Sequence, residues 1–326
     1  MTELPPMTES EAIKRLVDIN VDYVKRSPYP AQRSAHGKGV ADVRAVFEVL
    51  DNIPQECKVG LFERPGTYSA IVRFSNGAKQ NDSHRDIHGM AVKVLDVPML
   101  TGPKGDDGIS VQDFIMLDSP VFIMGSLRSY IPFNHWFLEA NVSLKAKLRL
   151  GLLVIKNLRW VRTLMRLALH KVVAPLSTSY WSTTPYQLGS HVVKYKAIPV
   201  NPATAPAITG ENGRRVALRK QLEKGPGVFR FGVLLQTNPE TQPIENPRID
   251  WEENGVEPTV LAEIRITPEQ KIEAPVELEN ALTFSPGHAS EEHYPLGAIN
   301  RARIEIYAAA RRARLAAAAE TSQIKS

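Results

Sequence analysis

The 326-residue sequence has only one cysteine, Cys57, which excludes an intramolecular disulfide and any cysteine-based zinc or iron–sulfur site. It also lacks an apolar run of the roughly 18 residues that a membrane-spanning helix needs. The first residues, MTELPPMTESEAIKRLV, are acidic and contain prolines where a secretion signal would be basic and then apolar. We therefore expect a cytoplasmic protein.

Features that would indicate nucleic-acid binding are also missing. The sequence shows no DNA- or RNA-recognition motif, and a net charge of +5 does not by itself imply such a partner. Hydrophobic residues make up 43% and charged residues 23%, as in an ordinary globular enzyme. A chain of this length can enclose a sizeable ligand.

Most of the chain has the pattern of an antiparallel sheet or barrel, flanked by helices. A capping box at Thr8 and Glu11 predicts a helix that ends before Ser27-Pro28, and a second helix is predicted over 297–318. Between them, short β-branched and aromatic segments are separated by turn residues. The predicted strands are 45–50, 57–62, 68–75, 89–97, 112–117, 120–124, 178–189, 191–198, 215–222, 227–237 and 259–266.

The stretch 140–172 differs from its surroundings, because it has leucines at helical spacing, eight Lys or Arg residues and no Asp or Glu. We favour a helix pair that packs on the barrel and exposes a basic face. The alternative is a peripheral membrane contact on anionic lipid. In that arrangement the buried side would hold Leu153, Trp160, Leu164 and Leu167, and the headgroup side Lys156, Arg159, Arg162 and Arg166.

Three segments far apart in sequence combine arginine with a residue that can bind or polarise a ligand. They are RSAHGKG with Arg33 and His36, VRFSNG with Arg73 and Ser75, and RIEIYAAARRAR with Arg303, Tyr307 and Arg314. Each alone has an ordinary explanation, such as a surface histidine or a core tyrosine. Their order along the chain is what carries information.

In this order the segments resemble the haem catalase family over about residues 30–316. RSAHGKG is similar to R-V-V-H-A-K-G and VRFSNG to V-R-F-S-T-V. RDIHGMAVKV resembles R-D-P-R-G-F-A-V-K-F, SPVFIM resembles T-P-V-F-F-I, and RIEIYAAARRAR matches R-L-F-S-Y-x-D-T-x-R-x-R. The resemblance implies an α+β fold, a catalase-like antiparallel β-barrel in one domain. Its implied parts are an N-terminal arm (1–30), a first barrel half (31–139), a basic insert (140–172), a second half (173–296) and a haem helix (297–318).

The resemblance also implies haem b and assigns roles around it. Tyr307 would ligate the iron as phenolate, assisted by the positive charge of Arg303 one helical turn earlier. His36 would be the acid–base group, oriented by Ser75. Guanidinium groups of Arg33, Arg73 and Arg314 would hold the haem propionates.

The sequence departs from the family at positions expected near the distal pocket. Leu117 replaces the family's asparagine, unless a one-residue bulge brings in Asp118, and Gly77 replaces a channel valine. Asp86 matches the channel aspartate, Tyr130 sits near the family's aromatic on the distal haem face, and Phe122 is a further channel or distal-pocket candidate. These changes predict a pocket less adapted to hydrogen peroxide and more open to larger peroxides.

We therefore expect a haem-dependent, peroxide-consuming oxidoreductase with weak catalase or peroxidase activity, an unknown electron donor and a homo-oligomeric state. One alternative is a fatty-acid hydroperoxide isomerase or dehydratase resembling allene oxide synthase. The other is a non-catalytic haem-binding protein.

Overall fold

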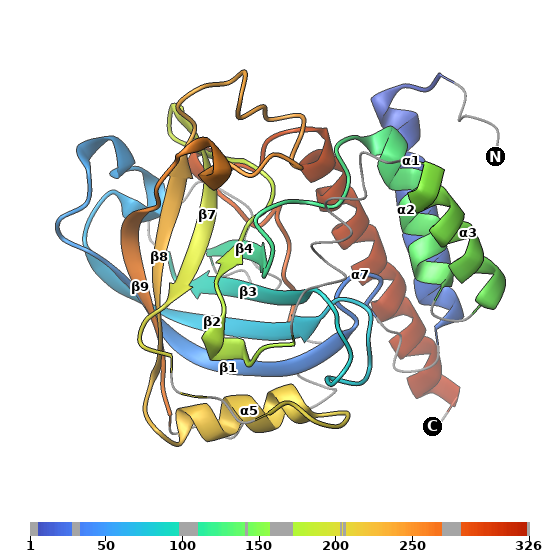
Figure 1. Cartoon of the computed structure of the whole chain (residues 1–326), viewed down its shortest axis with the longest axis horizontal. Helices are drawn as coiled ribbons and strands as arrows, with labels where there is room; N and C mark the ends of the chain where they lie inside the picture. Colours follow the sequence, from blue (N-terminus) through green and yellow to red (C-terminus); the bar gives the residue numbers. More distant parts are fainter. Residues whose placement is uncertain are drawn as a thin grey trace.

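The chain forms a closed antiparallel barrel with a layer of helices beside it (Figure 1). This computed structural model describes residues 6–27, 33–97, 110–140, 143–156, 172–202, 204, 207–268 and 282–324. The strands are β1 (Lys38–Val49), β2 (Gly66–Asn76), β3 (His88–Leu95), β4 (Val111–Leu117), β5 (Tyr180–Trp181), β6 (Tyr186–Leu188), β7 (His191–Pro199), β8 (Gly227–Leu235) and β9 (Thr259–Ile266). Their order is β5-β4-β3-β2-β1-β9-β8-β7-β6, and β5 also pairs with β7. That second pairing closes an eight-stranded barrel, with β6 attached outside the ring, and confirms the expected fold class.

The barrel interior is filled by side chains. Phe114 lies at its centre, with ring centroids of Phe231 and Tyr195 each 4.7 Å away. Phe47 stacks on the same ring at 6.0 Å and is fully buried. A small barrel packed in this way leaves no space for a large ligand inside it. A ligand site must therefore lie outside the barrel wall.

The helices form two groups. Helices α1 (Glu9–Arg26), α2 (Leu127–Glu139), α3 (Leu144–Lys156) and α7 (Ala298–Ile324) lie together on one side of the barrel, and α5 (Gly213–Leu222) lies apart from them, next to β1 (Figure 1). Leu16, Ile131 and Ile306 join α1, α2 and α7 in one buried cluster. The shorter 3-10 helices are η1 (Gln55–Cys57), η2 (Gly60–Phe62), η3 (Pro175–Ser177), η4 (Glu252–Asn254) and η5 (Glu291–His293). Within the described ranges, no helix has both the length and the apolar character needed to cross a bilayer.

Three predicted strands were wrong. Residues 57–62 form η1 and η2, in which Gly60 adopts the left-handed φ of 55° that ends extended structure. Residues 120–124 leave the sheet, and the backbone N–H of Phe122 bonds the carbonyl of Pro247 instead. Residues 215–222 belong to α5, because Ala, Leu, Arg, Lys and Gln are strong helix formers and the buried positions follow a helical spacing.

Two helical regions also differ from expectation. Helix α2 was not predicted, since its central Pro132 and aromatic residues do not give a clear helical signal. In the basic stretch 140–172, α3 accounts for residues 144–156. Six of the positions predicted to face lipid or the core lie outside the described residues: Arg159, Trp160, Arg162, Leu164, Arg166 and Leu167. The side chain of Lys156 is also outside the described part.

Candidate functional site

Tyr307 lies on the side of α7 that faces the barrel wall. Ala310, one turn later on the same side, is buried and lines a hollow together with Tyr307. One turn earlier, Arg303 is buried, and its guanidinium carbon lies 6.0 Å from the Tyr307 ring centroid. The Arg303 Nη1 donates to Thr184 Oγ1 and Asn300 Oδ1, both at 2.9 Å. Because both acceptors are neutral, these bonds orient the guanidinium beside the tyrosine without cancelling its charge.

His36 lines the same space as Tyr307 and lies immediately before β1. Its backbone φ of 52° is unusual for a residue other than glycine and marks a conformation held by its surroundings. The His36 carbonyl accepts from Arg73 Nη2 at 3.1 Å, and Nδ1 lies 3.1 Å from Ser75 Oγ. Burial, reinforced by the Arg73 charge, lowers the pKa of His36 to about 3. The imidazole is therefore neutral at physiological pH and able to accept a proton.

Gly89 makes space for this histidine. It is paired with Ser75 across β2 and β3. A Cβ at position 89 would lie 2.7 Å from His36 Nδ1 and 2.6 Å from Ser75 Oγ, both too short for real contacts. Gly89 was present in the matched RDIHGMAVKV segment, but its role follows only from the strand pairing.

We expect Gly89→Ala to displace the His36 ring, at a stability cost of about 1–3 kcal/mol from overpacking, and to lower by about tenfold or more the peroxide turnover that the family resemblance implies. Turnover per bound haem and the denaturation midpoint measure the two effects. Gly151→Ala is the matched control, since an added Cβ there has nothing within 4 Å. Equal turnover in both variants would contradict the positioning role of Gly89.

Two small hollows, each with a volume of about 40 Å³, are lined by Tyr307 and by arginine side chains. Arg33 lines both hollows, and its Nη2 donates to the carbonyl of Leu282 at 2.8 Å. Arg73 lines the hollow that also contains His36 and Ser75, whereas Arg314 lines the other. The structure thus brings the predicted arginines together around Tyr307. Arg311, which we had not assigned, joins them in the second hollow.

A larger cavity of about 610 Å³ extends from His36 towards α2 and α3. Its size is that of a typical small-molecule site. Five predicted pocket residues line it: Gly77, Asp86, Leu117, Phe122 and Tyr130. The Phe122 and Tyr130 rings meet edge to face at 5.5 Å. Burial raises the pKa of Tyr130 to about 12, so this phenol stays protonated.

Asp118 does not line this cavity. Its carboxylate accepts from the His88 backbone N–H at 2.8 Å and lies 2.5 Å from His88 Nδ1. The side chains of neighbouring residues at the end of β4 point to opposite sides, as in any strand. The main expectation therefore agrees with the structure and the alternative of a bulge does not: Leu117 lines the cavity, and the Asp118 carboxylate is held by His88 in the interior.

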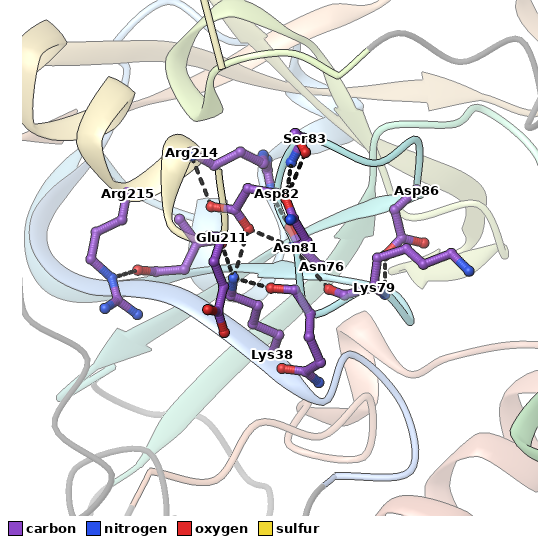
Figure 2. A network of polar contacts seen from close by, with 12 residues as sticks. Lys38, Asn76, Lys79, Asn81, Asp82, Ser83, Asp86, Glu211, Arg214 and Arg215 are labelled. Atoms are coloured by element: carbon purple, nitrogen blue, oxygen red, sulfur yellow. Dashed lines mark hydrogen bonds and ion pairs between the residues drawn. The ribbon is translucent and has the colours of Figure 1, made fainter. Parts of the chain in front are cut away.

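A polar network centred on buried Asp82 joins β1, β2 and α5 (Figure 2). Asp82 accepts from Asn76 Nδ2 at 2.7 Å and from the Arg214 backbone N–H at 2.8 Å, and it lies 3.1 Å from Lys38 Nζ. Arg214 Nη1 donates to Asn76 Oδ1 at 2.7 Å and to the Ser75 carbonyl at 3.1 Å. The network therefore fixes the residues that follow His36 and Ser75. Sequence reasoning missed it because α5 was predicted as a strand.

Asp86 lies between the Asp82 network (Figure 2) and the large cavity, which it lines. Its Oδ2 accepts from the backbone N–H groups of Ala78 and Lys79 at 2.8 and 2.7 Å, and its Oδ1 accepts from that of Ile87 at 2.9 Å. These bonds close the loop between β2 and β3. Asp86 thus has a structural task in addition to its place in the cavity lining.

Buried histidines predict acid sensitivity. Burial lowers the pKa of His293 from 6.5 to about 4, and this fully buried ring contacts the Tyr195 hydroxyl at 3.1 Å. Between these two pKa values the unfolded chain binds more protons than the folded chain, so the free energy of unfolding falls as pH falls. We expect His293 to account for a loss of about 2 kcal/mol between pH 7 and 5. Denaturant unfolding at both pH values tests this, and a pH-independent midpoint would contradict it.

Comparison with known proteins identifies the fold. No protein-family model matches the sequence, and no curated protein matches it significantly.

Among the described residues, no cluster of His, Cys, Asp or Glu is arranged to hold a metal ion by itself.

Solved structures of catalases, in contrast, superpose over most of the chain. A fungal catalase matches with a TM-score of 0.67 at 16% identity, covering 89% of this chain and 60% of its own. A bacterial catalase matches with a TM-score of 0.63 at 16% identity, covering 95% of this chain and 62% of its own. Catalase A from Saccharomyces cerevisiae matches with a TM-score of 0.62 at 15% identity, covering 97% of this chain and 67% of its own. The chain therefore spans less than two thirds of the length of the first two catalases. At these identities the likeness establishes architecture, and the chain has the catalase fold.

Proposed function

We propose that the chain is a haem-dependent oxidoreductase that cleaves peroxides. The observation that carries this proposal is that His36, just before β1, and Tyr307 of α7 line one hollow, with Ser75 and arginines around them. A neutral imidazole facing a phenol next to a buried guanidinium is a suitable arrangement for acid–base chemistry opposite a metal-binding oxygen.

The residues present fit a haem. The hollow that contains His36 shares Ala35 and His36 with the larger cavity, and together they offer a space flanked by apolar side chains such as Met116, Phe122 and Phe284. Guanidinium groups at the Tyr307 end suit propionates. When bound, haem would supply the iron that activates the peroxide, with the Tyr307 oxygen as its protein ligand.

The chain's own residues would then move the proton. His36 Nδ1 contacts Ser75 Oγ, which leaves Nε2 for the substrate. At Nε2, His36 accepts the proton from one peroxide oxygen and donates it to the other as that oxygen leaves as water or alcohol. Ser75 and the Arg73 bond to the His36 carbonyl keep the ring in place. Leu117 excludes water from this side but offers no amide to orient hydrogen peroxide.

The apolar character of the cavity favours a second candidate reaction. With Leu117 and Phe133 in its lining, it suits a bulky organic hydroperoxide, and an isomerase or dehydratase acting on fatty-acid hydroperoxides is the alternative. The contact between His36 and Ser75 argues against a protein that only binds haem, since binding alone does not need it.

The experiment is O₂ release from hydrogen peroxide, normalised to haem measured from the Soret band. Rapid release means a working catalase. Slow release, with consumption of organic hydroperoxides by haem-loaded protein, separates peroxidase from isomerase by whether an added reductant is required. Protein that binds haem and consumes no peroxide of either kind would overturn the proposal. A homo-oligomeric state, an external electron donor and a cytoplasmic location belong to the same proposal.

A further inference from the structure

Helix α3 presents an apolar stripe to solvent. Leu144, Leu148, Leu152 and Ile155 are 74%, 64%, 56% and 68% exposed. At 100° per residue these positions fall on one narrow face of the helix. Four large aliphatic side chains in one row are more than the scattered apolar residues of an ordinary surface.

The stripe is not the face by which α3 joins the molecule. The opposite face is docked: Ala146 and Leu153 are buried, and Leu153 joins Met124 and Phe133 in a small core. In Figure 1, α3 lies on the outer side of α2, away from the barrel. The helix therefore has one apolar face for its own fold and a second that its neighbours in the described chain do not bury.

The charges around the stripe all have one sign. The charged residues of α3 are Lys145, Lys147, Arg149 and Lys156, with no carboxylate. Lys145 and Lys147 lie on opposite flanks of the stripe, and both are exposed. An aliphatic row bordered by cations is the pattern of a helix that lies in the surface of an anionic bilayer.

A second copy of the chain fits this surface less well. A two-fold interface brings each patch against itself, so the flanking cations of the two copies would be brought close together. Removing them from water without a carboxylate partner costs free energy. We propose that α3 docks on an anionic lipid surface, with the leucine stripe at the acyl boundary and the lysines among the headgroups.

If α3 lies on the lipid surface, one end of the large cavity would lie next to that surface. Lys147, Leu150 and Gly151 of α3 line that cavity at one end, and His36 lines it at the other. The exposed cations Lys79 and Arg85 also belong to its lining. Docking itself does not depend on haem chemistry. The consequence for substrate, that apolar hydroperoxides reach His36 directly from the bilayer, rests on the proposed function.

The test is flotation of the full-length haem-loaded protein with vesicles of phosphatidylcholine alone or mixed with phosphatidylglycerol, at low and high salt. We expect binding to the anionic vesicles that weakens with salt. The double variant Leu148→Glu/Leu152→Glu should partition roughly tenfold or more weakly. The control is Val216→Glu/Leu315→Glu, which adds the same charge at exposed apolar positions of α5 and α7 and should bind like the wild type.

Three outcomes would overturn the proposal: no binding of the wild type to anionic vesicles, equal loss of binding in both double variants, or conversion of a wild-type oligomer to monomers by the stripe variant alone. Sedimentation velocity without vesicles detects the last outcome. Haem content and peroxide consumption, measured on the same preparations in buffer, show separately whether the proposed function fails.

Discussion

Replacing Tyr307 with phenylalanine is expected to abolish stable haem binding while the fold is retained. The phenol oxygen is the atom at this position that can ligate iron, and the substitution removes it without changing the packing of the ring. We expect the haem content per chain to fall by on the order of tenfold, measured as Soret absorbance after gel filtration, with an unchanged far-ultraviolet circular dichroism spectrum.

Tyr130→Phe is the matched control. Tyr130 is also near Arg303 and lines the large cavity, yet its phenol is kept protonated by burial. This variant should keep its haem. If Tyr307→Phe retained as much haem as Tyr130→Phe, the assignment of the iron ligand would have to be abandoned.

Replacing His36 with alanine is expected to leave haem bound and to slow peroxide cleavage by roughly 10²–10⁴-fold, the usual contribution of a general acid–base group. Nothing else in the described lining offers a neutral imidazole at that place. Stopped-flow mixing of haem-loaded protein with peroxide measures the rate directly. His84→Ala, an exposed histidine outside the cavity lining, should react like the wild type.

The left-handed backbone of His36 requires a second variant. Alanine is strained at a φ of 52°, whereas asparagine tolerates it. His36→Asn therefore removes the imidazole but keeps the local backbone. A slow reaction in both variants assigns the effect to the imidazole. A fast reaction in His36→Asn would show that backbone geometry, and not proton transfer, limits the alanine variant.

Local patterns in the sequence predicted the parts of the molecule that depend on nearby residues. Alternating β-branched segments predicted β2, β3 and β4, and the capping box at Thr8 correctly began α1. The order of the His36, Ser75 and Tyr307 segments predicted residues that the structure brings around one space.

The parts that could not be predicted depend on long-range contacts. Arg214 is buried because its partners come from the end of β2 and the turn after it, far away in sequence, and nothing in the α5 segment itself indicates them. The importance of Gly89 depends on its register with Ser75. The exposed leucines of α3 have the same spacing as core leucines, so periodicity alone could not tell an outer face from an inner one.

The barrel is closed unevenly. β1 and β2 pair along their length, from Lys38↔Asn76 to Val49↔Gly66, whereas β4 meets β5 only at Leu117↔Trp181. Hydrogen exchange of backbone amides should therefore be fastest at this seam, since local opening needs the fewest bonds to break there. Leu117 also borders the large cavity. The barrel wall beside the cavity is thus the part that can open locally without unfolding the rest. Such local opening would let the cavity accept peroxides of different size.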